Sequence, residues 1–289
     1  MLPFELSTDL CSLVPNKPRP AYVFKMKLDG NNSKVISSEL FEAMIESKYK
    51  HSYEYIDEVL EKNDPTNIYN KLFQITQKLK KNRLKNGFDF RNDEIRLVLD
   101  DNQELCDFKT ESSSPSHSLV EECMLLANQE AAKKLKSIGI FRVHDEPSDT
   151  KIKKLLDEVN YLGINAKLKD DVHSTITNIQ KLAKNVSLEQ EVDELIIQSQ
   201  QQASYSSLKK PHFGLGFNDY SHFTSPIRRY SDLVLHRILK NGSIPDNIDE
   251  ICEDISFRER EIASLVWDYE DRKYARYLCN HIGHVFTAT

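Results

Sequence analysis

The sequence predicts an α+β fold, and three observations support this class. Residues 93–105 (DEIRLVLDDNQEL) alternate apolar and polar side chains, as a half-buried β-hairpin does. Residues 118–138 carry apolar side chains three and four positions apart, which is the spacing of an amphipathic helix. A second amphipathic pattern predicts a long helix at about 248–279. With 289 residues, the chain is long enough for one large domain or two small ones.

The first third of the chain predicts a hairpin followed by two helices. Strand-like segments at 21–30 and 33–45 flank a Gly-Asn turn. Ser52 is a candidate N-cap for a helix that reaches about residue 62. Either Thr66 or Asn67 is a candidate N-cap for the next helix.

The remainder of the chain is predicted to be mainly helical. The serine-rich segment 111–118 is expected to be a loop, and the helix after it to end at Gly139, because glycine is common just past a helix end. Beyond this glycine we expect a strand at 140–144, helices near 149–161, 173–184, 187–202 and 226–240, and a short strand or loop at 212–217. Trp267, the only tryptophan, lies among apolar residues of the closing helix and is expected in the core.

Composition limits the classes of protein that the chain can belong to. It is 39% hydrophobic and 29% charged, which is typical of a folded globular protein. No apolar run approaches the roughly 18 residues of a membrane span, and the start does not resemble a signal peptide, so we expect no membrane partner and a cytoplasmic location. Five cysteines without a CxxC pair predict neither a zinc site nor a disulfide framework.

A formal net charge of −6 argues against indiscriminate nucleic-acid binding but leaves room for a local basic channel. Lys209 and Lys210 are candidates for lining such a channel because they lie shortly before the most informative segment of the chain. The basic run 78–85 is another candidate, although the solvated end of a helix explains it more simply.

That most informative segment is YSHFTSPIRRYSDLVLHRIL, at 220–239. Ser225 followed by Pro226 is a helix-start signal. Arg228 and Arg229 would then lie in the first turn, where cations cost about 0.3–1 kcal/mol each because the helix dipole is positive there. A bound anion would reverse this cost, since amides, a hydroxyl and two guanidinium groups form a phosphate site. The alternative is that both arginines are solvated surface residues.

The segment resembles the signature of the RNB-domain exoribonucleases, the family of ribonuclease II and ribonuclease R, whose usual form is close to HFTSPIRRYxDLxxHR. The chain carries HFTSPIRRY at 222–230, followed by Asp232, Leu233, His236 and Arg237. Other segments resemble the family in the same order: LPFELSTDLCSL at 2–13, HSYEYIDEVL at 51–60, ECMLLANQEAA at 122–132, GIFRVHDEP at 139–147 and FREREIASLVWDYEDRKYARYL at 257–278. The resemblance covers nearly the whole chain, from residue 2 to about 282.

The resemblance implies an RNB-type catalytic domain, in which a mixed sheet packs with several long helices. Residues 1–282 would form this domain, truncated at both ends, and residues 283–289 would be the stub of a following OB-type RNA-binding barrel.

The resemblance also implies roles for individual residues. Arg228 would grip the phosphate near the scissile bond, and Tyr53 would pack against the last nucleotide at the 3′ end, as catalytic residues. The remaining RNA-binding candidates are Arg229, His222, Phe223, Thr224, Ser225, Arg142, Lys209 and Lys210. His222 could supply a hydrogen bond and Phe223 a stacking surface for a base.

Simpler explanations remain open at two of these positions. Tyr53 could be a core-facing residue of an ordinary helix. Arg142 and His144 would share one face of a strand, where a structural salt bridge to a neighbouring acidic residue explains both equally well. Val266 stands close to a position where family members often have a glutamate, which puts any contact from that position in doubt.

Magnesium is the cofactor that the resemblance implies, and no small-molecule cofactor is expected. In the family, a D-x-D-D-A type run before the LPxxLS segment holds the metal, which activates water and stabilises charge on the phosphate. This run is absent from the sequence, so we assign no metal ligands. The paired aspartates at 100–101 and 170–171 look like a solvated turn and a charged loop.

Three functions remain open. The first is a 3′→5′ exoribonuclease domain that degrades single-stranded RNA to nucleoside monophosphates, with little or no activity in this chain alone. The second is a non-catalytic RNA-binding remnant of the same family. The third is an assembly protein that uses the fold for protein contacts, for which no RNA affinity is expected.

Overall fold

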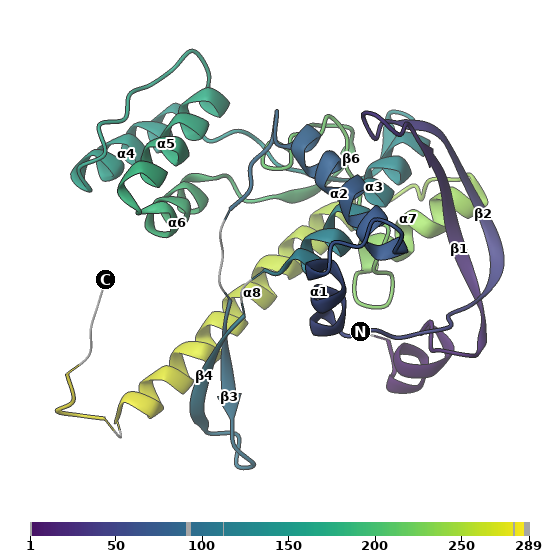
Figure 1. Cartoon of the computed structure of the whole chain (residues 1–289), viewed down its shortest axis with the longest axis horizontal. Coiled ribbons are helices and arrows are strands. Elements are labelled where there is room, and N and C mark those ends of the chain that lie inside the picture. Colours follow the sequence, from purple (N-terminus) through teal and green to yellow (C-terminus); the bar gives the residue numbers. More distant parts are fainter. Residues whose placement is uncertain (1, 91–93, 112, 280, 286–289) are drawn as a thin grey trace.

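The computed structural model describes residues 2–90, 94–111, 113–279 and 281–285 (Figure 1). A body contains both long hairpin strands and most of the predicted helices, a lobe of three helices lies to one side, and an arm extends away from the body along the last helix (Figure 1). No helix among the described residues is long and apolar enough to cross a membrane.

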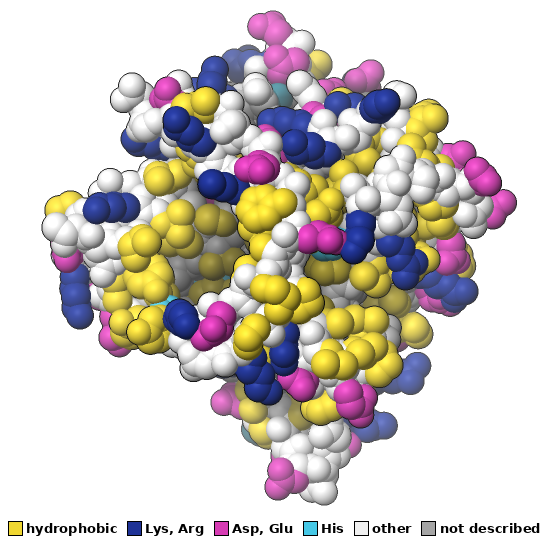
Figure 2. All heavy atoms as spheres, turned by 90° about the vertical axis from the view of Figure 1, so that its right-hand side faces the viewer, with side chains coloured by type: hydrophobic (Ala, Val, Ile, Leu, Met, Phe, Trp, Pro, Cys, Tyr) yellow, Lys and Arg dark blue, Asp and Glu magenta, His cyan; other side chains and the backbone are white. Residues whose placement is uncertain are grey.

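The body contains four strands and the helices around them. Its elements are a short π-helix at Leu6–Leu10, β1 (Pro18–Leu28), β2 (Val35–Glu46), α1 (Tyr53–Glu61), α2 (Ile68–Arg83), α3 (Pro115–Lys134), β5 (Ile138–Val143), β6 (Ser204–Leu208), α7 (Tyr230–Asn241) and the first half of α8 (Ile248–Cys279). The β1–β2 hairpin confirms the prediction made from its Gly-Asn turn. Figure 2 views the molecule from the side of this hairpin, where apolar side chains gather at the centre with charges of both signs among them.

The α+β class is confirmed, but the strands do not form one mixed sheet. In the described chain they pair as three separate two-stranded antiparallel sheets, β1–β2, β3–β4 and β5–β6. The pairing of β5 with β6 was not predicted, because SYSSL is short and largely polar and becomes a strand through contact with β5.

Two hydrophobic cores stabilise the molecule. In the body, Phe141 of β5 and Leu235 of α7 are fully buried and pack with Cys252 of α8. In the lobe, α4 (Asp149–Tyr161), α5 (Val172–Val186) and α6 (Glu189–Ser199) enclose Ile152, Ile176 and Ile196. The lobe helices lie close to their predicted ranges, because each has a clear apolar face.

The caps of α1 and α2 are confirmed. The Ser52 side chain accepts a hydrogen bond from the Tyr55 amide, and Asn67, not Thr66, accepts one from the Tyr69 amide. The boundaries of α3 were predicted incorrectly. This helix begins at Pro115, inside the expected serine-rich loop, and ends at Lys134. Gly139 is not its end but lies in β5, where a Cβ atom would approach the Leu135 side chain to 2.6 Å.

The start of α7 was also predicted incorrectly. The helix begins at Tyr230, because Arg229 has extended backbone angles of φ −122° and ψ 122°. Ser225 is therefore not its N-cap, and Arg228 does not lie in its first turn. Instead the Ser225 carbonyl accepts hydrogen bonds from the Arg228 and Arg229 amides, at 3.2 and 3.0 Å, and closes a separate turn before the helix.

The bounds of α8 are confirmed, and its second half forms the arm together with the hairpin of β3 (Glu94–Leu99) and β4 (Leu105–Glu111). Phe108 of this hairpin stacks on Tyr274, with ring centroids 5.8 Å apart. The expectation that Trp267 is a core residue was wrong, because 66% of its surface is exposed.

Two expectations fall partly outside the described residues. The predicted hairpin started at residue 93, which is not described, although β3 and β4 confirm the rest of it. Of the expected barrel stub at 283–289, residues 286–289 lie outside the described part, and residues 283–285 form no strand.

Candidate nucleic-acid interface

The segment that leads into α7 is held against the edge of β5. The Arg142 amide donates a hydrogen bond to the Tyr220 carbonyl at 2.9 Å, and the Ser221 hydroxyl donates to the Ile140 carbonyl. Since β6 pairs with β5 through its own ladder, β5 lies between β6 and this segment. The backbone that precedes the two arginines is therefore fixed by the core of the body.

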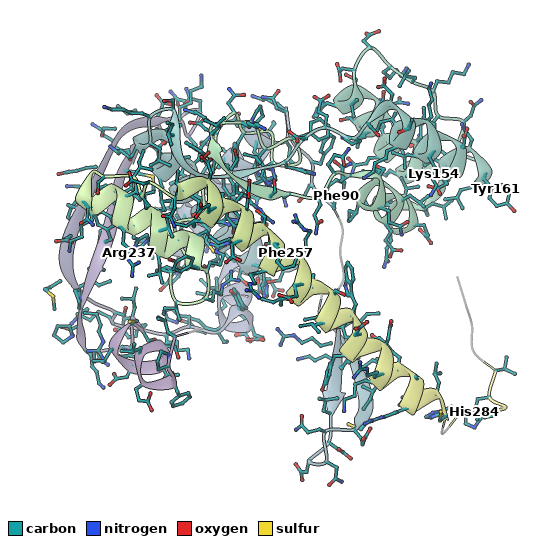
Figure 3. All side chains as sticks on the ribbon, turned by 180° about the vertical axis from the view of Figure 1, so that it is seen from behind. Phe90, Lys154, Tyr161, Arg237, Phe257 and His284 are labelled. Carbon is teal, nitrogen blue, oxygen red and sulfur yellow. The ribbon has the colours of Figure 1, made fainter. Side chains whose placement is uncertain are left out.

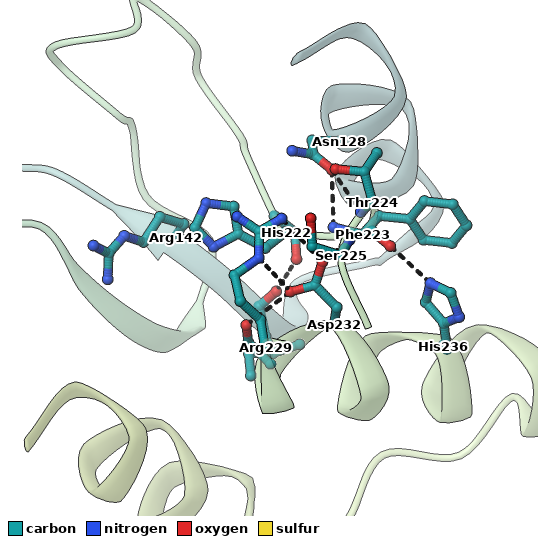
Figure 4. Close-up of polar contacts among 12 residues, drawn as sticks. Asn128, Arg142, His222, Phe223, Thr224, Ser225, Arg229, Asp232 and His236 are labelled. Carbon is teal, nitrogen blue, oxygen red and sulfur yellow. Dashed lines mark hydrogen bonds and ion pairs between the residues drawn. The ribbon is translucent and has the colours of Figure 1, made fainter. Parts of the chain in front are cut away.

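Asn128, on α3, holds the next two residues (Figure 4). Its side-chain oxygen accepts hydrogen bonds from the amides of Phe223 and Thr224, at 2.9 and 3.2 Å. Its side-chain nitrogen donates to the Tyr220 hydroxyl at 2.8 Å. Asn128 is only 1% exposed, so these bonds satisfy polar groups that have little access to water.

Asp232, in the first turn of α7, fixes the turn from the other side (Figure 4). Its carboxylate accepts a hydrogen bond from the Ser225 amide at 2.7 Å and forms an ion pair with Arg229, with 2.9 Å between Nε and Oδ2. The Ser231 hydroxyl lies 3.1 Å from the same carboxylate. Asp232 is fully buried, and Arg229 is its counter-ion, so Arg229 has a structural role in this arrangement.

Arg228 differs from its neighbour. It is exposed, and no other residue in the described part of the chain forms an ion pair or hydrogen bond with its guanidinium group. Its positive charge is close enough to contribute to the lowered pKa of His222. The structure thus places a free guanidinium group on a turn whose backbone is anchored by Asn128 and Asp232. Such a group can bind a phosphate oxygen or a carboxylate.

His222 lies between the turn and β6 as a neutral side chain. Its Nδ1 is 2.9 Å from the Tyr205 hydroxyl. Burial lowers the pKa of His222 to about 2, and the charges of Arg229 and Arg142 add to this effect. At neutral pH the ring therefore carries no charge, and it can form hydrogen bonds through its nitrogens.

The Phe223 ring does not form the expected stacking surface. It is 6% exposed and packs edge-on against Phe24 of β1, with centroids 4.9 Å apart, and against His236 at 4.3 Å. His236 donates from Nε2 to the Phe223 carbonyl at 2.8 Å, because a carbonyl can only accept. Phe223 therefore packs into the hydrophobic core and holds the turn against it. The expectation that its ring offers a stacking surface to a base was wrong.

Thr224 and Ser225 shape the backbone of the turn. The amides of both residues are bound by buried side chains, Asn128 and Asp232 respectively. The Thr224 hydroxyl is buried and has no hydrogen-bond partner among the described residues.

Arg142 forms the structural salt bridge that was the alternative explanation. Its two terminal nitrogens lie 2.5 and 3.1 Å from the Glu259 carboxylate of α8, and its guanidinium group lies 4.8 Å from the centre of the Tyr205 ring. Lys209 pairs with Asp219 at 2.7 Å. Lys210 is exposed and has no ion-pair partner within the described ranges. Of these three cations, only Lys210 is uncommitted.

Tyr53 begins α1 and is 44% exposed, so it is not a core-facing residue. One face of its ring stacks on His117 of α3, with centroids 3.7 Å apart and an angle of 18° between the ring planes. Among the described residues, no hydrogen bond or ring contact joins Tyr53 to the turn that carries Arg228. The structure thus presents an exposed aromatic ring on α1, apart from the bonds that hold the signature segment.

The basic run 78–85 has mainly structural contacts. Lys78 donates to the Gly30 carbonyl and Lys80 pairs with Asp89. Arg83 is buried and forms an ion pair with Glu122 at 2.6 Å. This run therefore connects α2 to its neighbours, and most of it is not free to bind RNA.

No group of three or more His, Cys, Asp or Glu side chains within the described ranges could hold a metal ion. The residues present therefore do not fit the magnesium that the resemblance implies. The paired aspartates have local roles instead: Asp100 accepts two backbone hydrogen bonds in the β3–β4 turn, and Asp171 caps α5.

Sequence reasoning missed the two residues that hold the turn, Asn128 and Asp232. Asp232 was visible as part of the signature, but its role as counter-ion to Arg229 was not predicted. Asn128 gave a weaker signal, namely a polar residue on the apolar face of a long helix.

Comparisons with known proteins agree with the geometry. A family model described as the RNB domain matches residues 1–243. Ribonuclease R of Helicobacter pylori is 38% identical over 295 residues, which cover 96% of this chain and 45% of that protein. Ribonuclease R of Thermotoga maritima is 34% identical over 317 residues, covering 99% and 44%.

A solved structure of Mycoplasma genitalium RNase R in complex with ribose methylated single-stranded RNA matches with a TM-score of 0.89 at 26% identity. The match covers 98% of this chain and 48% of that one. The chain thus spans about half the length of the curated relatives it matches.

Proposed function

Because the chain belongs to the RNB domain family, we propose that it is part of a 3′→5′ exoribonuclease and that its own residues grip single-stranded RNA. The observation that carries this proposal is the contrast between two adjacent arginines. Arg229 is committed to buried Asp232, whereas Arg228 is exposed on the same anchored turn. An unpaired guanidinium group carried on an anchored backbone is suited to the phosphate backbone of RNA.

Arg228 would bind a phosphate oxygen near the bond to be cut and stabilise the negative charge that develops there. Neutral His222 would offer a hydrogen bond beside Arg228. Its Nδ1 already contacts the Tyr205 hydroxyl, so the other ring nitrogen would bind the RNA. Tyr53 would offer the free face of its ring to the terminal base.

Hydrolysis requires more than these groups supply. Magnesium would activate the attacking water in an enzyme of this family, but the described residues contain no cluster that fits a metal. We therefore infer that this chain by itself binds single-stranded RNA weakly and turns it over little or not at all. The same observation favours a second function, a non-catalytic RNA-binding protein of the same fold.

A labelled single-stranded oligoribonucleotide tests both functions. Binding is measured by fluorescence anisotropy at two salt concentrations, and degradation is measured in the presence of magnesium. We expect weak binding that declines with salt, because phosphate contacts release counter-ions, and no release of nucleoside monophosphates. Release of monophosphates would overturn the inference of low turnover, and absence of any binding would overturn the RNA-binding function itself.

A further inference from the structure

Four aromatic side chains meet outside both hydrophobic cores, where the loop after β2 reaches α1 and α2. They are Tyr49 and His51 of the loop, Tyr55 of α1 and Tyr69 of α2. The His51 ring stacks with two tyrosines. Its centroid lies 5.7 Å from that of Tyr49, at 24° between planes, and 5.0 Å from that of Tyr55, at 17°. Tyr49, His51 and Tyr55 thus form a column of nearly parallel rings.

The column is held in place by hydrogen bonds at its base. The Tyr69 hydroxyl lies 2.8 Å from His51 Nε2, and the Tyr69 ring meets the His51 ring edge-on. Ser52 caps α1 by accepting from the Tyr55 amide. His51 and Tyr55 are therefore ordered by the cap of one helix and the first turn of the next, and Tyr49 contacts them through its stack on His51. A ligand would thus meet a largely preformed surface.

The outer end of the column is open. Tyr49 is 78% exposed and Tyr55 is 48% exposed, so solvent or a ligand can reach both rings. Lys48 and Lys50 flank Tyr49 on the loop. Lys48 pairs with Glu46 at 2.6 Å, whereas Lys50 is exposed and has no ion-pair partner in the described chain. The loop end of the column therefore combines a flat aromatic face with an uncommitted positive charge.

We propose that the Tyr49–His51–Tyr55 column is a second base-stacking platform for single-stranded nucleic acid, on which one unpaired base lies against the outer face of Tyr49. The proposal rests on the proposed function. A base is the occupant that fits, because it presents a flat π-surface joined to a negative phosphate, and the loop presents a flat ring beside Lys50.

The position of the column supports this choice. Tyr53 and Tyr55 both belong to the first turn of α1, but their rings enter different stacks, Tyr53 with His117 and Tyr55 with His51. Two aromatic stacks thus begin at the first turn of α1. Acidic residues such as Glu54 and Glu58 follow on α1, so a nucleic-acid strand would approach from the loop side, where Lys50 lies.

The test measures the affinity of three tyrosine variants for a single-stranded oligoribonucleotide by fluorescence anisotropy. Tyr49→Ala should weaken binding by about fivefold or more, because one base loses its stacking partner. Tyr49→Phe should bind like the unmodified protein, since stacking needs the ring and not the hydroxyl. Tyr161→Ala is the matched control, because Tyr161 is 94% exposed at the far side of the lobe (Figure 3) and should have no effect.

A second ligand separates base stacking from charge. Against an oligomer whose nucleotides lack bases, the unmodified protein and Tyr49→Ala should bind equally, because only phosphates remain to be bound. In NMR spectra, the His51 ring signals should shift when the normal oligomer is added and should stay in place with the baseless one.

Three outcomes are distinguishable. A loss of affinity in Tyr49→Ala that Tyr49→Phe does not share supports the platform. Unchanged affinity in Tyr49→Ala, together with weaker binding in Arg228→Ala, overturns the platform and leaves the proposed function intact. No binding of RNA by the unmodified protein overturns both.

Discussion

Asp232, in the first turn of α7, forms an ion pair with Arg229, which precedes the helix, with 2.9 Å between Oδ2 and Nε. The carboxylate is fully buried, and 20% of the arginine side chain is exposed. This pair separates the roles of two adjacent arginines, since it commits Arg229 to the fold and leaves Arg228 free for a ligand.

Replacing Asp232 with asparagine should therefore destabilise the protein by about 3 kcal/mol, because it leaves a largely buried guanidinium group without a counter-ion. Urea unfolding measures the change in the free energy of unfolding. The matched control is Glu261→Gln, because Glu261 and its partner Arg258 are both exposed, at 47% and 62% of their side chains, and the loss of this pair should cost less than about 1 kcal/mol. Equal costs for the two variants would contradict the structural role of Asp232.

Asn128 anchors the turn through three hydrogen bonds, so Asn128→Leu should cost about 3 kcal/mol of stability. The variant leaves the buried amides of Phe223 and Thr224 without an acceptor. It should also weaken RNA binding, because the turn that carries Arg228 loses its support. A variant that unfolds at the same urea concentration as the unmodified protein would refute this account of the turn.

The folded protein should lose stability in acid because it keeps two histidines neutral, His222 and His212. Burial lowers the pKa of His222 to about 2 and that of His212 to about 3, so both are neutral in the folded state. In the unfolded chain a histidine binds a proton below about pH 6.5. Stability should therefore fall as the pH drops below about 6.5, by up to about 2 kcal/mol per histidine between pH 7 and pH 5.

Urea unfolding at pH 7 and pH 5 measures this effect for the unmodified protein and for His222→Gln. Glutamine does not titrate, so the variant should lose less stability on acidification than the unmodified protein. An identical pH dependence in the two proteins would show that His222 is not held neutral by the fold.

Trp267 is exposed in the structure, whereas the sequence predicted a buried position, and the two cases have different effects on stability. Trp267→Gln should change the free energy of unfolding by less than about 0.5 kcal/mol, as is usual for surface positions. A core tryptophan would cost about 3–5 kcal/mol, and Phe141→Ala, at a fully buried position, provides that comparison. Because Trp267 is the only tryptophan, its fluorescence in the folded protein should also be readily quenched by acrylamide.

Much of the fold could be predicted because its signals are local. The apolar spacing of α8 extends over 32 residues, which is enough to fix both of its ends. The caps at Ser52 and Asn67 depend on single side chains that precede their helices. The signature segment likewise identified the turn that carries Arg228.

The errors arose where distant residues decide the local structure. The start of α7 depends on the contact between Asp232 and the Ser225 amide, which the local sequence does not reveal. The burial of the Phe223 ring could not be predicted, because its neighbours Phe24 and His236 come from other elements. Gly139 matched a helix end, although it lies in β5, next to the Leu135 side chain.

The contribution of Arg228 to RNA binding is measured by comparing the affinities of Arg228→Ala and Lys154→Ala for a single-stranded oligoribonucleotide. Both variants remove one positive charge, but Lys154 lies on the distant lobe (Figure 3). Arg228→Ala should bind about tenfold more weakly and with a shallower salt dependence, while Lys154→Ala should bind like the unmodified protein. Equal affinity of the two variants would contradict the claim that the turn before α7 grips RNA.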